Sequence, residues 1–552
     1  MKKLSSIFAR LCDERGVALL MTLIVMLVVF VGGMALTLAS ITDRKMVTAD
    51  QSYQHALDAA ESGVAAAVSY LNSLAVPIAS TSPLILKSGA ADSAITEGAF
   101  NTCCGGYSVG DAWFDLVIDP RDNNSGSATR LYLIRSTGYA RGQDGNQVTR
   151  QVEIVAQQIN FARYAYFEDT YLNGTYWPPE SVFQGPYHTN AHLVIYADNS
   201  GPNFFEEVTQ HEADVVYLYG SGAIGAQFHK GITVNFPVIE LPSNTTKLVN
   251  AASGGIRLTG STWIDFFTVH DTTDPSAIPA GYALIGNANL AANAPAGSVI
   301  GSAFCSGGGG NVGANMAVVK LTDRYDYLNA AAGIQSGGAN GVISLTGAGN
   351  TANFSLCRQY QGVLWPQIAT ALAVPQAHLQ WGLTGSNTVS IDGQGWIYDD
   401  TRYYYYGGNP QGILGIVASN NLSIKSNTRN GLGGGAGCSA QPADSATCHV
   451  QVDGTVMTLN KSYQGENYNK NGLRGTMYLF GGTIQEQGGL FGVGDGSGNS
   501  IHGWSESYTY DNRLMNTPPP YYPTTGVYTF LDRRERSVAI PTTTLADTPN
   551  TF

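Results

Sequence analysis

The feature that most constrains this chain is an uninterrupted apolar stretch near its N-terminus. Val17 to Ile41 contains no charged residue, whereas the short segment before it carries Lys2, Lys3, Arg10 and Arg15. As a helix the stretch rises about 1.5 Å per residue, enough to cross a hydrocarbon core of about 30 Å. An ordinary secretory signal has a shorter apolar run followed by its cleavage site, but here Gly16 precedes the run. The sequence therefore predicts one membrane-spanning helix at 17–41.

The helical pattern continues beyond the apolar stretch. Apolar residues recur at spacings of three and four along one face, at Met46, Ala49, Tyr53, Ala56, Ala60, Val64, Ala67 and Leu71. Pro77 closes the pattern, so we expect one long helix over about 17–75. Gly32 and Gly33 are adjacent within it, and paired glycines predict a soft point.

Composition favours an exported, β-rich protein of several domains. Charged residues make up 13% of the 552 residues, 66 residues are glycine, and the formal net charge is −12. That charged share is about half the usual one in soluble domains. The acidic balance and the lack of a basic cluster exclude nucleic acid as a predicted partner.

Cysteine usage also predicts export. Seven cysteines are present, of which Cys12 precedes Gly16. The other six suggest disulfides, with 15 connectivities open. Cys438 and Cys448 flank a polar loop and form the best local pair, and Cys305 with Cys357 is the second expected pair. Adjacent Cys103 and Cys104 would bond to each other only with strain.

A small β-sheet is expected after the helix, over residues 76–160. Residues 78–105 are predicted as loop, and three strands follow at Tyr107–Asp119, Arg130–Tyr139 and Gln147–Gln157. In the last of these, apolar and polar residues alternate, which is typical of a half-buried strand.

The rest of the chain, residues 161–540, is predicted to be a large all-β domain. Short β-like runs are separated by Gly and Asn, as at Thr388–Tyr398, His449–Leu459 and Leu473–Gln485. A β-solenoid is favoured and a sandwich is the alternative; no fixed period is evident. Gly- and Ala-rich segments at 280–316 and 330–342 are expected to be surface loops, and 541–552 a flexible tail. The predicted fold class is thus α+β.

Two groups of residues could carry chemistry. His188 and His192 are four apart and could bind a metal on a helix, but the surrounding Gly-Pro and strand pattern favour a structural turn. Asp392, Asp399 and Asp400 could act as acid and base in a β-helix glycan-active enzyme, but the Asp-Gly signal favours a turn. Calcium at 119–125 or 492–500 is a weaker alternative, because neither segment has EF-hand spacing. No cofactor and no catalytic residue is predicted.

Tyrosines are concentrated in R-Y-Y-Y-Y-G-G at 402–408 and P-P-P-Y-Y-P at 518–523. Exposed tyrosines favour adhesive or glycan-binding surfaces, because each ring offers contact area and a hydroxyl. Packing at a strand edge and a polyproline corner is an equally good interpretation.

The N-terminal residues resemble type IV prepilins, in particular PilX-type minor pilins and related pseudopilins. The shared elements are the basic leader 1–16, G-V-A-L-L at 16–20, and A-L-D-A-A-E-S-G-V-A-A-A-V at 56–68, which contains Glu61. The resemblance implies that prepilin peptidase cuts after Gly16 and that Val17 is then N-methylated. Major pilins have a glutamate where this chain has Met21, so the resemblance implies a rare or initiating subunit.

The predicted function follows from that resemblance. We expect a non-enzymatic pilin-like subunit that is held in the inner membrane before assembly and then packs with other pilins or pseudopilins in a filament that lies outside the cytoplasm. A tip position, with a role in priming or in adhesion to a surface or glycan ligand, is the leading hypothesis. The alternatives are a tethered glycan-active enzyme and an uncleaved membrane-anchored envelope protein. Segments 181–195, 412–424 and 510–523 resemble an uncharacterised domain found behind PilX-like stems, which implies no activity.

Overall fold

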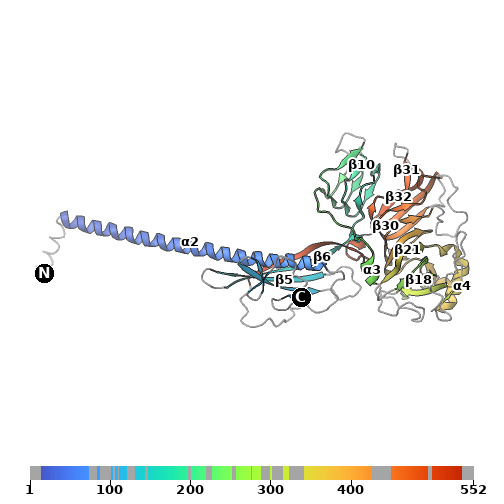
Figure 1. Cartoon of the computed structure of the whole chain (residues 1–552), viewed down its shortest axis with the longest axis horizontal. Coiled ribbons are helices and arrows are strands. Elements are labelled where there is room, and N and C mark those ends of the chain that lie inside the picture. The colour runs from blue at the N-terminus through green and yellow to red at the C-terminus, as the bar shows by residue number, and fades with distance from the viewer. Residues whose placement is uncertain are drawn as a thin grey trace.

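The computed structural model shows a long helix, a small sheet packed on its second half, and a large β-rich region beyond (Figure 1). It describes residues 14–73, 84–86, 101–103, 106–109, 111–120, 131–142, 147–172, 174–196, 201–218, 227–251, 256–274, 276–287, 299–300, 315–321, 341–425, 449–470, 472–494 and 500–537. The predicted α+β class is confirmed. Cys12, Cys104, Cys305, Cys438, Cys448 and the tail 541–552 lie outside the described residues, so both disulfide pairs remain predictions.

Helix α2 runs without interruption from Glu14 to Ser73. It therefore begins just before Gly16, and the end of the expected leader is not a structural boundary. The helix also passes through Gly32 and Gly33 without a break, and nothing lies within 4 Å of a Cβ placed at either glycine.

The second half of α2 packs on an antiparallel sheet, which we call the head. The sheet order is β2-β3-β4-β5-β6-β33, with β1 paired to β4. The strands predicted at 130–139 and 147–157 correspond to β5 and β6, but the one predicted at 107–119 is divided into β3 and β4, which pair antiparallel with each other. Strands β1 and β2 fall in the segment expected to be loop. The bounds are β1 Leu84–Leu86, β2 Asn101–Cys103, β3 Gly106–Val109, β4 Ala112–Pro120, β5 Leu131–Arg141, β6 Gln147–Asn160 and β33 Thr524–Ser537.

The last strand, β33, corrects the expected domain boundaries. It pairs antiparallel with β6, and Thr524 lies directly opposite Asn160. The large β-rich region, residues 161–523, is therefore inserted between two neighbouring strands of the head, and we call it the insert. The sequence analysis predicted several strands within 161–540 but none at 524–537, so it assigned the whole segment to the large domain and missed the strand that belongs to the head.

The head and insert are joined by two chain crossings that bond to each other. The Phe161 amide donates to the Pro523 carbonyl (3.0 Å), and the Asn160 side-chain amide donates to the Tyr522 carbonyl (2.8 Å). The Thr525 hydroxyl donates to the Ile159 carbonyl (3.1 Å). Because the crossings share these bonds, the insert is attached through a two-stranded neck rather than a single linker.

Small residues allow α2 to lie close to the head sheet. The buried helix face includes Ala56, Ala60 and Ala67. A Cβ at Gly138 on β5 would lie 1.9 Å from the Ala56 carbonyl oxygen, and one at Gly63 would lie 2.1 Å from the Ser136 hydroxyl. The A-A-E-S-G element is thus a contact surface that larger residues would push apart.

The first part of the insert is built from short parallel strands stacked in register. Phe183, Phe204 and Phe228 are aligned in successive strands, and their rings stack with centroids 5.0 and 5.1 Å apart. Tyr187, Val208 and Ile232 form a second aligned row. These rows reveal a repeat of 21 to 24 residues that the sequence analysis missed. The strands are β7 Tyr166–Thr170, β8 Val182–Phe183, β9 Tyr187–Thr189, β10 Val194–Tyr196, β11 Asn203–Phe204, β12 Val208–Gln210, β13 Val216–Leu218, β14 Gln227–Phe228 and β15 Ile232–Thr233.

Strand β7 joins this stack to a larger one by pairing with both β9 and β30. In the larger stack β21, β23, β26, β28, β30 and β32 pair in parallel order. The parallel pairing of these strands favours a solenoid over a sandwich. The solenoid remains a prediction. Strand β18 occupies part of the expected loop 280–316, and helix α4 was not predicted. The bounds are α3 Thr246–Ala251, β16 Ile256–Leu258, β17 Thr262–Val269, β18 Ala280–Asn287, β19 Val299–Ile300, β20 Asn315–Leu321, β21 Val342–Phe354, α4 Gln361–Leu372, β22 Leu379–Trp381, β23 Gly385–Ile397, β24 Tyr405–Tyr406, β25 Asn409–Pro410, β26 Gly412–Ala418, β27 Leu422–Ile424, β28 Val450–Thr458, β29 Tyr463–Gly465, β30 Leu473–Gln487, β31 Gly492–Gly494 and β32 Ser500–Thr509.

Candidate functional site

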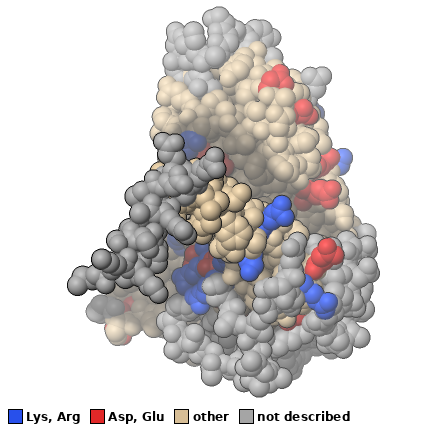
Figure 2. Space-filling model, turned by 90° about the vertical axis from the view of Figure 1, so that its left-hand side faces the viewer, with Lys and Arg blue, Asp and Glu red and all other residues tan. Residues whose placement is uncertain are grey.

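The first half of α2 is an apolar surface that the rest of the chain leaves uncovered. Its large apolar side chains from Leu19 to Val47 are all exposed. The hydroxyls of Thr22 and Thr37 each donate to a carbonyl four residues earlier in the helix. Figure 2 looks along the helix from its free end. The part of the helix drawn in tan shows no Lys, Arg, Asp or Glu, and the charged residues in this view lie around and behind it. By length and composition this helix could cross a membrane.

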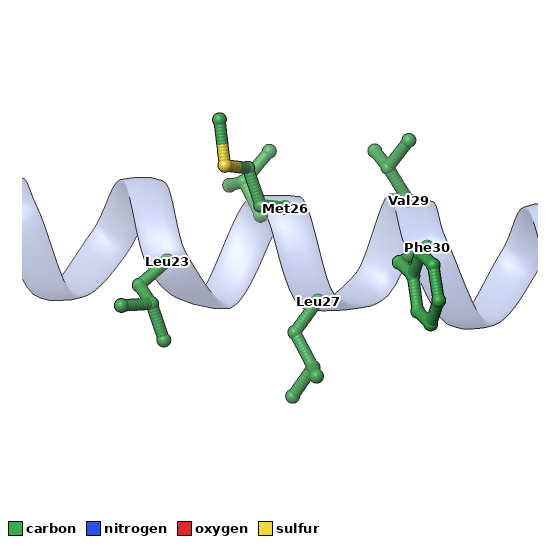
Figure 3. Close-up of a pocket in the computed structure, with 6 residues that line it drawn as sticks. Leu23, Met26, Leu27, Val29 and Phe30 are labelled. Atoms are coloured by element: carbon green, nitrogen blue, oxygen red, sulfur yellow. The ribbon is translucent and has the colours of Figure 1, made fainter.

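The apolar side chains of this helix do not enclose a cavity. A shallow surface pocket is lined by Leu23, Val25, Met26, Leu27, Val29 and Phe30. Figure 3 shows Leu23 and Leu27 on one side of the helix and Met26 and Val29 on the other. The surface is thus suited to contact with lipid or with other helices on several sides, rather than to holding a small molecule.

The residues expected to serve assembly occupy different environments. Met21 lies on the apolar half and is 60% exposed. Because this residue is a methionine, no carboxylate stands at that position of the helix. Glu61 lies on the head-bound half and forms an ion pair with Arg533 of β33. The exposed pair therefore connects α2 to the returning strand. Gly16 and Val17 lie within α2, but the structure does not describe the Val17 side chain.

His188 and His192 are not brought together as a metal site. His188 is fully buried, with Nδ1 2.7 Å from the Thr209 hydroxyl and Nε2 2.9 Å from Asn190 Oδ1. Burial lowers the pKa of His188 to about 4, which favours a neutral imidazole. His192 instead lies at the surface, 4.0 Å from Glu212. Among the described residues no group of three or more His, Cys, Asp or Glu is placed to hold a metal ion.

Asp392, Asp399 and Asp400 also do not form one site. Asp392 is partly exposed and accepts a bond from the Ser419 hydroxyl (3.4 Å). Asp399 and Asp400 are buried, and the Asp400 carboxylate pairs with Arg402 at 3.1 Å. The turn expected at Asp392-Gly393 is wrong, because both residues lie within strand β23, whereas Asp399 and Asp400 follow the end of that strand.

A buried cluster that the sequence analysis missed surrounds Asp399. Asp265 on β17 accepts the Cys357 backbone N–H at 3.2 Å. Arg358 is placed so that it favours the charged forms of Asp265 and Asp399. Burial is nevertheless the largest effect and raises the pKa of each carboxyl to about 7. The available signal was a single carboxyl inside the apolar run T-W-I-D-F-F-T-V.

Cys357, beside this cluster, is fully buried and disulfide-bonded. Its expected partner, Cys305, is not among the described residues.

The run of four tyrosines is sorted onto two faces. Tyr403 and Tyr405 lie on the side of β28 and β30: the Tyr403 ring is 6.1 Å from the Phe480 ring, and the Tyr405 hydroxyl donates to Asp453 at 3.3 Å. Tyr404 and Tyr406 face His270, with the Tyr404 hydroxyl 2.6 Å from Nδ1 and the Tyr406 ring 4.8 Å from the imidazole. Alternate residues of an extended chain point to opposite sides. Tyr403 and Tyr404 are buried, whereas Tyr405 and Tyr406 are each 42% exposed.

The exposed apolar half of α2 continues into a half that packs on a small antiparallel sheet, which is the arrangement that the resemblance to pilins implied. Residues 15–65 match the family model described as PilX N-terminal. The chain thus has a type IV minor pilin-like N-terminus. No curated protein matches the sequence.

One solved structure also matches, the competence-associated pilin ComZ from Thermus thermophilus. The alignment has 10% identity and a TM-score of 0.23, and covers 88% of this chain and 98% of that one. That TM-score is too low to establish a shared fold.

Proposed function

We propose that this protein is a minor subunit at the tip of a type IV pilus or pseudopilus, where it primes assembly and contacts a surface. Its exposed apolar half-helix is held in the inner membrane before assembly. After cleavage following Gly16, the same surface packs against the helices of other pilins.

The observation that carries the tip position is the place of the insert. Most of the chain extends from the head at the end away from the exposed half-helix (Figure 1). A shaft made of such subunits would have to accommodate an insert on each one, whereas a single subunit at the tip leaves the insert free to make outward contacts. The lack of a carboxylate at Met21 supports the same position through the resemblance to pilins.

The processing experiment is mass spectrometry of the intact chain and its N-terminus from native membranes and sheared filaments. We expect a chain that begins at N-methylated Val17 and is present in filaments at low copy number, with labels on the insert seen at filament ends. A chain that retains residues 1–16 and stays in membranes would contradict the proposal.

The structure also allows priming to be separated from surface contact. Because Asn160 and Thr524 are opposite each other on adjacent strands, a two-residue Asn-Gly turn could replace residues 161–523. We expect cells with this variant to assemble filaments in normal number but to lose attachment. Filament loss with a stably folded head would contradict a priming role for the head and stem.

A further inference from the structure

One face of the insert combines aromatic rings with side chains that form hydrogen bonds. It is built on the middle strand β30, which pairs in parallel with β28 on one side and β32 on the other. Met477 and Leu479 point into the core, so the alternate residues Thr476, Tyr478 and Phe480 lie on the other face of the strand. Tyr478 is exposed there, whereas Phe480 is partly buried, with its ring centroid 6.1 Å from that of Tyr403. We call this outward surface, with its neighbours in register, the β30 face.

The register places polar residues on both sides of these rings. On β28, Gln451 is opposite Tyr478 and Asp453 is opposite Phe480. On β32 the outward positions opposite Thr476, Tyr478 and Phe480 are Ser505, Ser507 and Thr509. Apart from the Asp453 carboxyl, which is buried, none of these side chains is charged.

A rigid hairpin adds a further ring to the β30 face. Strands β24 and β25 are joined by Gly407 and Gly408, both with positive φ, as a tight two-residue turn requires. Arg513 fixes the hairpin base by donating to the Pro410 and Gly412 carbonyls at 2.8 Å each. The Tyr405 hydroxyl reaches Asp453, next to Phe480. Tyr405 and Tyr478 remain 42% and 41% exposed.

The chemistry of the β30 face excludes several kinds of partner. An added peptide strand needs free main-chain groups, but β30 is already paired on both sides. A nucleic acid needs basic side chains, and the outward positions named above include none. An apolar helix would bury the Ser and Thr hydroxyls without partners.

We propose that the β30 face binds an uncharged glycan chain. The C–H faces of sugar rings would pack on Tyr405, Tyr478 and Phe480, while sugar hydroxyls bond to Gln451 and to the hydroxyls of β32. The outward Gln, Ser and Thr side chains suit a neutral polysaccharide, and the nearby Arg402 and Arg513 are paired with Asp400 and Asp511. This inference rests on the proposed function, since it names the ligand class and the surface through which the tip subunit adheres.

The first test measures binding of the full-length protein in detergent micelles to a printed array of neutral and acidic oligosaccharides. Titration with the best neutral oligosaccharide on the array follows. Y405A and Y478A are each expected to weaken binding about tenfold or more, as for the loss of a central aromatic anchor. Y406A is the matched control, because Tyr406 is equally exposed on the same hairpin but faces His270. It should bind as the wild type does.

Several outcomes would overturn the inference. These are no binding to any neutral glycan, binding confined to acidic glycans, equal loss in Y406A, or attachment to protein-coated surfaces that glycosidase treatment does not reduce. Loss of binding in Y405A counts only if its thermal unfolding matches that of the wild type, and Y405F, which retains the ring, should recover most of the affinity.

A parallel measurement separates this inference from the proposed function. Y405A and Y478A should still be cut after Gly16 and enter sheared filaments, while the cells lose attachment to the glycan. Wild-type protein that binds the glycan but never enters filaments would contradict the pilin function and leave the β30 face supported.

Discussion

The head and the insert bury different chemistry. The head is held together by small apolar residues of α2 lying directly on the sheet, as at Ala56, Ala60 and Gly63. The insert, by contrast, buries carboxyl groups: burial raises the pKa of Glu168, Asp265 and Asp399 to about 7 and of Asp453 to about 6. The contact between α2 and the head sheet thus depends on close fit of small residues, whereas the insert holds buried carboxyl groups whose protonation depends on pH.

The largest expected effect tests the shape requirement in the head. G138V would place side-chain atoms against the α2 backbone, where even a Cβ lies 1.9 Å from a carbonyl oxygen. We expect the head to lose about 3 kcal/mol or more of stability. Hydrogen exchange of peptides from 131–160 measures this loss.

The matched control is G33A, since nothing lies within 4 Å of a Cβ there. It should leave exchange in the head unchanged. Equal protection of the head in G138V and G33A would show that close contact between α2 and the sheet does not stabilise it.

The next effect concerns the half of α2 that the head does not cover. V28K places a charge in the middle of the exposed apolar stretch, which costs about 3 kcal/mol for membrane insertion. We expect less protein in the membrane fraction, with exchange in the head unaltered. D58K, at an exposed position of the head-bound half, should be retained in membranes normally; equal retention of both variants would contradict the assignment of the two halves.

A smaller effect tests the buried carboxyls of the insert. The pKa of Asp399 is about 7 in the folded state against 3.8 as its ordinary value. Between those values the folded protein holds a proton that the unfolded chain releases, so stability falls as pH rises through 7. The unfolding temperature of the insert should therefore increase as pH is lowered from 8 to 6.5. The lower end of this range reaches the ordinary pKa of His188, whose lowered pKa in the folded protein acts in the opposite direction from there downward.

D399N should flatten this pH dependence by about 0.7 kcal/mol per pH unit near pH 7, where the folded carboxyl is half protonated. Tryptophan fluorescence is a suitable measurement, because every tryptophan except Trp113 lies in the insert. D392N is the control, since Asp392 is partly exposed. Identical pH profiles for D399N and the wild type would contradict the role assigned to burial.

The smallest expected effect concerns the ion pair between Glu61 and Arg533. Both side chains are about half exposed, and such pairs contribute less than about 1 kcal/mol. E61A should therefore increase hydrogen exchange in β33 only slightly. The double variant E61A/R533A should show little more exchange than E61A alone. A large loss of stability, insensitive to salt, would show that the pair holds β33 in place more strongly than an exposed pair does.

Much of the fold could be predicted because its signals are local. The apolar run and the three- and four-residue spacing predicted α2, and alternation predicted β4, β5 and β6. The Gly-Gly pair at 407–408, which forms the hairpin turn, could also be seen in the sequence. Local patterns did not reveal the stacked phenylalanines, because Phe183, Phe204 and Phe228 are separated by variable segments.

For the candidate site on α2, the sequence likewise predicted only the local features. The sequence by itself determined that a long apolar helix begins near Gly16 and that no carboxylate stands at position 21, since both are properties of single residues and their spacing. Only the tertiary structure decided which half of that helix is covered, which face each of Tyr403 to Tyr406 occupies, and that β33 returns to β6. These outcomes depend on contacts between residues far apart in the chain, from 48 positions for Tyr405 with Asp453 to 364 for Thr524 with Asn160. Many distant strands of similar pattern could have formed the same backbone bonds.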